Sequence, residues 1–371
     1  MSSPDKLKVA IVCDWLTGIG GAEQVVLELH QMFPDAPIFT SQYDPNKIDW
    51  FTDADVRTTW VNKLPKKMKK FLPVLRAISF SKLKLSDYDL ILSSSGAEAK
   101  AVKTGPNTIH ICYCHSPTHY YWARYDAYLK NPGFGAFDWL ARFGLKLLVG
   151  PMRKWDYKAA QRPDYLIANS NFTKSAILKY YGRESTVIYP PVDVDKYKPR
   201  TNETTSRNGF VITGRQTPYK RIDLAVAACT KLNLDLVVIG DGPDNQKLRA
   251  MAGPTINFVG QVNDDIKAGY LLSAKAFIFP GIDDFGIAAV EALAAGTPVI
   301  AYKDGGALDY INEKTGLLFS EQTPVGLSMA IEKFKTTSFD NNYIKDFSES
   351  FSETTFKNAL GKFLDSLQNR R

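Results

Sequence analysis

Apolar residues occur along this chain as short runs that alternate with helical patterns. In the first half the runs cover residues 8–14, 89–95 and 109–114, and an apolar helix is expected at 24–32. In the second half they cover residues 210–213, 236–240, 256–260, 276–279, 298–302 and 316–319. Strands that alternate with helices pair in parallel and carry helices on both faces of the sheet. The pattern therefore predicts an α/β protein with two doubly wound parallel sheets.

A polar stretch divides the chain in two. Apolar packing positions stop after Tyr189-Pro-Pro-Val-Asp193 and start again at residue 210, beyond a polar run over 196–208. A length of 371 residues gives each half enough chain for a hydrophobic core of its own. We therefore expect one domain over residues 1–190 and a second over 191–354, followed by a helix within residues 355–371.

The stretch 280–300 predicts the end of a strand, a loop and an Ala-rich helix. Asp283 and Asp284 precede the helix, where their carboxylates can cap free backbone N–H groups, and Glu291 lies two turns further in. Residues 285–287 are expected to form the first turn, with N–H groups directed at the crevice above the strand ends. The alternative without function is an ordinary capped helix with Glu291 in solvent.

Basic residues follow the first strand of the second domain. Gly214 and Arg215 come directly after the run at 210–213, and Lys220 follows five residues later. A guanidinium and an ammonium group at the carboxyl end of a strand can grip one diphosphate from two sides. The alternative is an ordinary solvated loop, but the strand-end position favours a phosphate site.

Two features of the first half also lie at strand ends. The Gly-rich segment 18–23 joins the first strand to the first helix, so its N–H groups can approach a phosphate. Its spacing does not fit a dinucleotide site. His115 follows the run at 109–114, at the sheet edge where α/β sites are built. A lone His is more often structural, yet this position favours a functional role.

Residues 56–86 contain nine Lys or Arg and no acid. Apolar residues recur among these cations at helical spacing, and we expect Pro73 to kink the helix. One interpretation is a segment that lies on anionic lipid, and the other is a surface helix whose apolar side joins the core. A second basic, aromatic stretch at 134–155 would cooperate, although its glycines weaken the helix prediction. The residues expected to contact a membrane are Lys66, Lys67, Lys69, Lys70 and Phe71.

Composition narrows the class of protein. With 44% apolar and 23% charged residues, the chain has the composition of a globular protein. No run approaches the roughly 18 to 20 apolar residues of a membrane span, and the start is too polar for a signal peptide, so we expect a cytosolic protein. Residues 1–190 hold 25 Lys and Arg against 17 Asp and Glu, which gives this half a charge of +8. The chain as a whole carries +7, so residues 191–371 carry −1. The basic run lacks a motif that reads nucleic acid, which disfavours such a partner.

The four cysteines show no disulfide pattern. Cys112, Cys114 and His115 suggest a metal at first sight. A Cys-x-Cys pair, however, lies on one face of a strand, whereas zinc is usually held by Cys-x-x-Cys. We therefore expect buried structural cysteines and no metal site.

Several of these segments together resemble the retaining glycosyltransferases of family 4. The resemblance rests on Asp283 and Glu291 separated by seven residues, on Gly-Gly-Ala-Glu at 20–23, and on Gly-Arg-x-x-x-x-Lys-Arg at 214–221. The segments 109–117, 169–172 and 187–193 further resemble a subgroup that includes bacterial lipopolysaccharide and O-antigen mannosyltransferases. Two positions depart from the pattern, because Asp283 stands where Glu is usual and Gly96 where the subgroup often has His.

The resemblance implies the GT-B fold, in which two Rossmann-like domains face each other across a cleft and the last helix crosses back onto the first. It also implies metal-independent transfer of a hexose, with mannose from GDP-mannose as first choice, to a glycan or lipid-linked acceptor at the inner face of the cytoplasmic membrane. The implied catalytic residues are His115, Arg215, Lys220, Asp283 and Glu291, and the implied donor-binding residues are Gly20, Gly21, Gly214, Val262, Phe285, Gly286 and Ile287. In this pattern Arg215 and Lys220 hold the diphosphate, and Glu291 holds the ribose.

Other functions stay open at this stage. The same fold could use a UDP-sugar, or could hydrolyse or epimerise a nucleotide sugar. The chain could also be a non-catalytic basic protein that binds a nucleotide sugar or a nucleic acid. The family holds the nucleotide base largely through backbone groups, so side chains do not identify the base. The acceptor, the linkage and the oligomeric state are not predicted.

Overall fold

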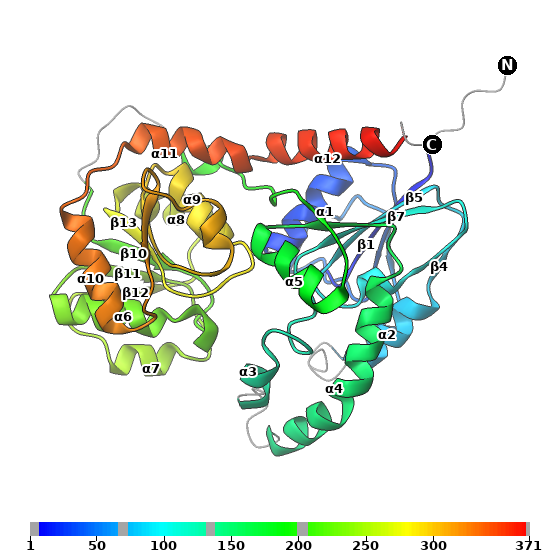
Figure 1. Cartoon of the computed structure of the whole chain (residues 1–371), viewed down its shortest axis with the longest axis horizontal. Helices are drawn as coiled ribbons and strands as arrows, with labels where there is room; N and C mark the ends of the chain where they lie inside the picture. Colours follow the sequence, from blue (N-terminus) through cyan, green and yellow to red (C-terminus); the bar gives the residue numbers. More distant parts are fainter. Residues whose placement is uncertain (1–6, 66–72, 131–137, 199–206, 369–371) are drawn as a thin grey trace. The chain divides into compact units, whose positions relative to one another are not determined.

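The computed structural model describes residues 7–65, 73–130, 138–198 and 207–368, which fold as two compact units, Met1–Tyr189 and Pro190–Arg371 (Figure 1). Each unit contains a parallel β-sheet with helices on both faces. The predicted α/β fold class, with two doubly wound parallel sheets, is therefore confirmed.

The sheet of the first unit has the strand order β3-β2-β1-β5-β7-β8-β9, and all neighbouring pairs are parallel. Its strands are β1 (Val9–Cys13), β2 (Ile38–Thr40), β3 (Val56–Thr58), β5 (Leu90–Ser95), β7 (Ile109–Cys114), β8 (Tyr165–Ala168) and β9 (Thr186–Val187). A separate short pair joins β4 (Lys84–Leu85) to β6 (Lys103–Thr104). All residues of β1 and β5 are buried, as expected for the middle of a covered parallel sheet.

The described helices of the first unit include a long one over a stretch that contains glycines. They are α1 (Gly21–Met32), α2 (Pro73–Lys82), α3 (Tyr125–Lys130), α4 (Asp138–Ala160) and α5 (Asn171–Tyr181), with the short 3₁₀ turns η1 (Trp60–Lys63) and η3 (Ala99–Ala101). The described part of α2 starts at Pro73, so the kink predicted there involves residues 66–72, which lie outside the described residues. The glycines of α4 do not prevent a helix of 23 residues, because its second half is anchored by buried side chains.

The second unit matches the predicted strands closely. The order is β12-β11-β10-β13-β14-β15, again parallel throughout. The strands are β10 (Phe210–Thr213), β11 (Leu236–Ile239), β12 (Ile256–Gly260), β13 (Ala276–Phe279), β14 (Val299–Tyr302) and β15 (Gly316–Phe319). Each predicted run therefore forms a strand, with ends shifted by one residue at most.

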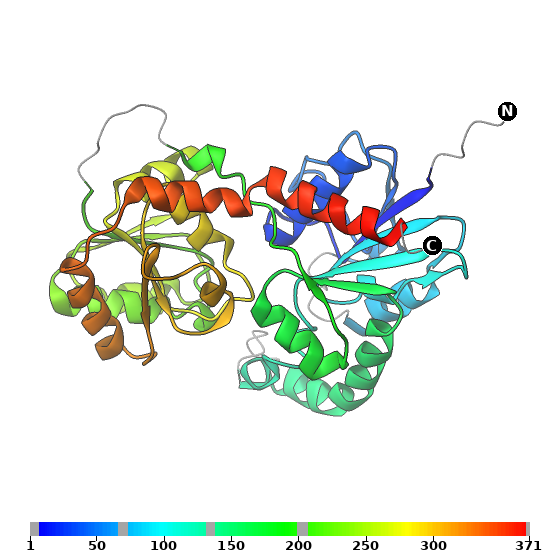
Figure 2. The same ribbon diagram turned by 45° about the horizontal axis from the view of Figure 1, so that its top comes forward.

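Helices cover both faces of this second sheet. They are α6 (Ile222–Leu232), α7 (Asn245–Ala250), α8 (Asp264–Ser273), α9 (Ile287–Ala294), α10 (Pro324–Lys335), α11 (Asn341–Ser348) and α12 (Glu353–Gln368), with 3₁₀ turns η5 (Asp195–Tyr197), η6 (Pro218–Lys220), η7 (Gly305–Asp309) and η8 (Glu349–Phe351). Helices α6 and α10 pack on one face and α9 and α11 on the other (Figure 2). Among the described residues, no helix has the length and apolar character that crossing a membrane requires.

The strand order places the two central strands of the second sheet at a switch point. β10 pairs with β11 on one side and with β13 on the other, so the chain leaves these strands in opposite directions. In open parallel sheets, ligands bind at the carboxyl ends of the strands beside such a point. The loops after β10, β11, β12 and β13 are therefore the first place to look for a site.

The cysteines behave as predicted. All four, Cys13, Cys112, Cys114 and Cys229, are buried and free. Burial raises the pKa of the Cys112 thiol to about 11 and that of Cys229 to about 12, so both stay protonated at neutral pH. These thiols are therefore packing groups. In the described part of the chain, no three or more His, Cys, Asp or Glu side chains are grouped to hold a metal ion.

The buried His110 of β7 predicts a pH dependence of stability. Its Nε2 lies 2.8 Å from the Ser93 hydroxyl oxygen, and burial lowers its pKa from 6.5 to about 3. The unfolded chain binds a proton below about pH 6.5 while the folded chain does not, so the folding equilibrium should weaken by up to about tenfold per pH unit between pH 6 and 4. Denaturant titrations at several pH values in this range should show that the free energy of unfolding falls less steeply with decreasing pH in His110→Asn than in the native chain. The same dependence on pH in both proteins would show that His110 does not cause the loss of stability.

Candidate active site

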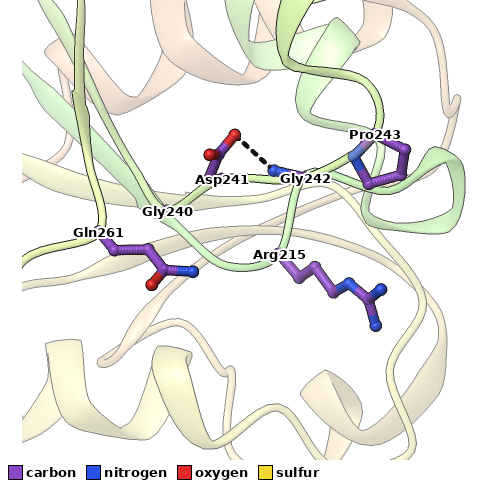
Figure 3. A pocket seen from close by; sticks show the side chains of 6 residues that line it. All are labelled: Arg215, Gly240, Asp241, Gly242, Pro243 and Gln261. Carbon is purple, nitrogen blue, oxygen red and sulfur yellow. Dashed lines mark hydrogen bonds between the residues drawn. The ribbon is translucent and has the colours of Figure 1, made fainter. Parts of the chain in front are cut away.

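An open hollow of about 390 Å³ lies at the carboxyl ends of β10, β11 and β12. Figure 3 shows the residues that line it: Arg215, Gly240, Asp241, Gly242, Pro243 and Gln261. Arg215 extends from the loop after β10 and Gln261 from the loop after β12, with the Gly240–Pro243 turn between them. The hollow is therefore built from three adjacent strand ends, at the edge where the sequence predicts a phosphate site.

Glycine allows the two central loops of the hollow to touch. Gly240 has a φ of 110°, and a Cβ there would lie 2.2 Å from the carbonyl oxygen of Gly214. The buried Gln216 ties the same loops together, because its Nε2 donates to the Gly240 carbonyl at 2.7 Å and its backbone N–H to the Asp241 carbonyl at 3.0 Å. Asn245 completes this support by donating to Gln216 Oε1 at 2.8 Å. The wall of the hollow is thus formed before any ligand arrives.

Arg215 is the cation of the hollow. Its side chain is exposed, and its guanidinium forms no hydrogen bond or ion pair with any residue that the structure describes. A free guanidinium presents five N–H donors in a planar fork that fits a phosphate or carboxylate. At its predicted position at the strand end, Arg215 is therefore available to bind an anionic ligand.

Lys220 lies on the neighbouring side of the same sheet edge. It ends η6, and its side chain passes the backbone of Gly214, the residue before Arg215, since a Cβ at Gly214 would lie 3.9 Å from Lys220 Cε. Its ammonium forms an ion pair with the carboxylate of Asp283, which follows β13. Because β10 and β13 are neighbours, two residues 63 positions apart in the chain meet here. The structure thus brings together Arg215, Lys220 and Asp283, three of the predicted catalytic residues, along adjacent strand ends.

Two further glycines allow close contacts of the loop after β13, Gly281 with η6 and Gly286 with Phe279 and Tyr310. A Cβ on Gly281 would lie 2.9 Å from Lys220 Cα, so only glycine admits η6 at this distance. Gly286 has a φ of 97°, and a side chain there would meet the ring of Phe279 and the hydroxyl of Tyr310. The Tyr310 hydroxyl donates to the carbonyl of Phe285 at 2.7 Å and also lies 3.2 Å from that of Gly286.

This geometry corrects the predicted start of the helix after β13. The helix α9 begins at Ile287, with Gly286 as a left-handed N-cap and no side-chain cap, whereas the sequence predicted a first turn from Phe285 and caps from Asp283 and Asp284. Asp283 is not a cap because its carboxylate pairs with Lys220 instead. Of the three predicted backbone positions, only Ile287 belongs to the helix, and Phe285 is buried below it.

Glu291 lies on α9, in a cluster with Tyr197 and Lys267. The Tyr197 hydroxyl donates to its Oε1 at 2.8 Å, and the Lys267 ammonium lies 3.0 Å from the same oxygen. Lys267 also stacks over the Tyr197 ring at 5.1 Å. Burial, and then the Glu291 carboxylate, raises the pKa of Tyr197, so the phenol remains a donor. Glu291 is not among the residues that line the hollow beside Arg215.

The remaining donor-site residues of the second unit lie next to the hollow in sequence. Gly214 has a φ of 149°, and its N–H donates to the Ile239 carbonyl at 3.1 Å. Val262 follows Gln261, one of the lining residues, and is half-buried. Both positions are compatible with the predicted roles, which stay predictions.

His115 lies at the carboxyl end of β7 in the first unit, as predicted. Its Nε2 lies 2.7 Å from the Ser94 hydroxyl oxygen, and its carbonyl accepts a hydrogen bond from Asn169 Nδ2 at 3.0 Å. A Cβ at Gly96 would lie 3.7 Å from His115 Cβ, so a larger residue at position 96 would stand directly beside this histidine. The missing side chain thus widens the space next to His115.

The Gly-rich loop of the first unit ends at a helix N-terminus. Gly20 is the N-cap of α1 in an extended conformation with a φ of −168°, and Gly21 is the first residue of the helix. The free N–H groups of this turn lie just beyond β1, where the sequence placed them. The five residues expected to contact a membrane, Lys66, Lys67, Lys69, Lys70 and Phe71, lie outside the described residues.

Sequence reasoning missed four residues that support these sites. Asp14 follows β1, and its buried carboxylate accepts N–H donors from Gly96 at 2.7 Å and Ala97 at 2.9 Å. The strand-end rule applied to His115 would also have found Asp14. No such signal marked the other three, Gln216, Tyr197 and Lys267. Gln216 bonds to a backbone carbonyl, and the partner of Tyr197 and Lys267 is distant in the sequence.

Comparisons with known proteins agree with this fold. The sequence matches the profile described as Glycosyltransferase Family 4 over residues 19–196 and the profile described as Glycosyl transferases group 1 over residues 193–351. It is similar to the D-rhamnosyltransferase WbpZ of Pseudomonas aeruginosa, with 28% identity over 192 residues, 47% of this chain and 49% of that protein. It is also similar to the GDP-mannose-dependent alpha-mannosyltransferase of Mycolicibacterium smegmatis, with 33% identity over 132 residues, 35% of each chain. The chain thus spans half or less of the length of these relatives.

A solved structure extends the likeness to the whole chain. Anabaena Alr3699/HepE in complex with UDP aligns with a TM-score of 0.68 over 97% of this chain and 100% of that chain. The two sequences are 17% identical, so the likeness concerns the fold.

Proposed function

The chain belongs to the family 4 glycosyltransferases, which have the GT-B fold, and on this premise we propose that it transfers a hexose from a nucleotide diphosphate sugar with retention of configuration. We propose mannose from GDP-mannose as the donor and a glycan or lipid-linked acceptor of cell-envelope polysaccharide or glycolipid synthesis. The subgroup resemblance of residues 109–117 and the similarity to a GDP-mannose-dependent enzyme support this donor.

The observation that carries the proposal is the guanidinium of Arg215 in the hollow, which has no partner within the described parts of the chain, with Lys220 beside it on the same sheet edge. When the bond between sugar and diphosphate stretches, negative charge grows on the leaving diphosphate. Two cations at its position would stabilise that charge, and one such contact typically changes a rate by about 10² to 10³. We propose that these cations allow the reaction to proceed without a metal ion.

The other residues have supporting roles in this proposal. Glu291 would accept hydrogen bonds from the ribose hydroxyls, held in place by Tyr197 and Lys267. Asp283 and the backbone around residues 285–287 would orient hydroxyls of the sugar, and His115 would contact the sugar near the acceptor. In this proposal no carboxylate acts as a nucleophile on the sugar. The leaving phosphate itself takes the proton from the acceptor hydroxyl.

A panel of nucleotide sugars tests the donor directly. GDP-mannose should raise the melting temperature more than UDP- or ADP-sugars at the same concentration, and EDTA should not reduce the shift, because cationic side chains hold the diphosphate. A larger shift with a UDP-sugar would favour the alternative donor. Loss of the shift in EDTA would contradict metal independence. Products formed without an acceptor would identify a hydrolase or an epimerase.

Gly281 provides a test of the contact between η6 and the loop after β13. Gly281→Ala should lower kcat/KM by about 10-fold to 10²-fold, because its Cβ would lie 2.9 Å from Lys220 Cα and would displace this cation. Steady-state kinetics measures the effect. Gly269→Ala in α8 is the matched control, since nothing lies within 4 Å of its added Cβ. Equal kinetics of both variants would mean that Lys220 need not lie at this place.

We propose the cytoplasm as the location, at the inner face of the membrane where a lipid-linked acceptor would be presented. Four buried free cysteines support a reducing compartment. When cells that express the chain are fractionated, the protein should be found in the cytoplasm and with inner-membrane vesicles. Recovery from an extracellular fraction would contradict this location.

A further inference from the structure

The helix α4 has two halves with different surroundings. Its second half is anchored, because Met152, Asp156, Ala159 and Ala160 are buried. No residue of its first half, 138–151, is buried. Large apolar side chains are instead exposed there: Trp139 by 67%, Leu140 by 49%, Phe143 by 63%, Leu147 by 65% and Leu148 by 43%.

The exposed side chains form a continuous row. Trp139, Phe143 and Leu147 follow one another at intervals of four, so they lie on the same side of the helix. Single exposed apolar residues are normal, but a row of this kind marks a surface that meets another apolar phase. Arg142 joins this half to α3 by donating to the carbonyls of Leu129 at 3.1 Å and Lys130 at 3.0 Å.

Beyond Asp138, the charges along this row have one sign. From Trp139 to Trp155 the chain contains four cations and no acid. Lys146 and Lys154 are exposed and Arg142 is 45% exposed, with an ion pair 3.8 Å long to Asp138 at the start of the helix. An apolar row flanked by cations is complementary to a bilayer whose headgroups are anionic and whose interior is apolar. A second copy docked through the same helix would have to match these cations with acids, and of the two acids on α4, Asp138 is paired with Arg142 and Asp156 is buried.

The anchoring of the helix makes it a fixed platform. Met152 packs with Ala77 and Tyr121, and Trp155 Nε1 donates to the Ser81 hydroxyl at 3.2 Å, so α4 is held against α2. The exposed half has 14 residues and is about 21 Å long, which is shorter than a bilayer core. Its geometry therefore suits a helix that lies in the headgroup region.

We propose that the first half of α4, residues 138–151, docks on an anionic lipid bilayer and inserts Trp139, Phe143 and Leu147 among the acyl chains. This inference builds on the proposed membrane location but not on the proposed donor or reaction. It places a membrane contact on the second basic, aromatic stretch, and the contact predicted for Lys66, Lys67, Lys69, Lys70 and Phe71 stays a prediction.

Vesicle flotation tests the apolar contact. The full chain should bind vesicles of phosphatidylglycerol and phosphatidylcholine and should not bind phosphatidylcholine alone. Phe143→Asp with Leu147→Asp should weaken binding by more than about tenfold, because two side chains that insert into the bilayer would become charged. The control is Met329→Asp, since Met329 is 68% exposed on α10 of the second unit and its change should have no effect. Unchanged binding of the double variant would overturn the proposal.

Charge and insertion are tested separately. Lys146→Glu should weaken binding by about tenfold and high salt should do the same, whereas Lys333→Glu on α10 should not. Brominated acyl chains should quench the fluorescence of the full chain, and Trp139→Phe should lose most of that quenching while still binding. Binding without quenching of Trp139 would overturn insertion, and a dimer that the double variant dissociates would assign the row to a second copy.

The donor proposal has its own readout. The double variant should keep its melting temperature and the shift that GDP-mannose produces, which shows that it is folded and that its donor site is intact. A chain that binds vesicles but no nucleotide sugar would refute the proposed reaction and leave the membrane surface standing. The reverse result would refute the membrane surface alone.

Discussion

Replacing Lys220 with alanine is expected to lower kcat by about 10² to 10³ with the donor saturating. The ammonium of Lys220 is held beside the Arg215 loop by the ion pair with Asp283, at the edge where the diphosphate would leave. Its charge matters most when the diphosphate gains negative charge, so the loss should appear in kcat and not only in KM. Initial rates of transfer from GDP-mannose measure the effect.

Two comparisons separate catalysis from support of the loop. Lys333→Ala removes an exposed lysine from α10 and should leave turnover unchanged. Asp283→Asn removes the ion pair while it keeps the Lys220 cation, so it should lower kcat less than Lys220→Ala if the cation acts on phosphate. Turnover of Lys220→Ala equal to that of the native chain would refute the assignment. Equal losses in the two variants would show that the pair only holds the loop.

The strands of the second sheet could be predicted almost residue by residue. Runs such as Ala276–Phe279 are buried on both faces, so the sequence must be apolar throughout, and Gly or Pro marks their ends. The position of Arg215 at the end of β10 followed from the same logic. What a strand end exposes can thus be read from local sequence alone.

The partners of the site residues could not be predicted. Glu291 contacts Tyr197, which is 94 residues away, and Lys267, which is 24 residues away, and neither spacing repeats a local pattern. The cap predicted for Asp283 failed for the same reason, because Lys220 from the neighbouring strand end competes for its carboxylate. Local rules give what a carboxylate can do, whereas the sheet order decides which cation reaches it.

The helix α4 shows a different limit. Glycine in a helix costs about 1 kcal/mol relative to alanine, so Gly144 and Gly150 lowered the helix prediction for this stretch. The helix forms because buried contacts, such as those of Asp156, fix its second half. These contacts cannot be predicted from the sequence pattern. Tertiary packing therefore outweighed local propensity.

Replacing Asp156 with alanine is expected to destabilise the first unit by about 3 to 5 kcal/mol. Its buried carboxylate accepts four donors: Lys100 Nζ and Thr118 Oγ1 at Oδ1, each at 2.8 Å, and Tyr181 Oη at 2.8 Å and Trp122 Nε1 at 2.7 Å at Oδ2. The Lys100 ammonium is also buried, so the variant leaves a cation without its anion. Denaturant unfolding of the first unit measures the loss, and Glu332→Ala in the exposed pair with Lys335 should cost less than about 1 kcal/mol.

The pH dependence of that variant identifies the cause of the loss. Burial lowers the pKa of Lys100, but Asp156 more than reverses this effect and the net pKa is raised. Without Asp156 burial is opposed only by the smaller effects of Cys114 and Asp14. We therefore expect the Lys100 pKa of the folded variant to fall below that of the unfolded chain, and the variant to gain stability relative to the native chain as pH rises toward 10. Lys100→Met with Asp156→Leu should recover most of the stability, because it removes both buried charges together. A deficit that stays constant from pH 7 to pH 10 would show that lost hydrogen bonds, and not the buried cation, destabilise the variant.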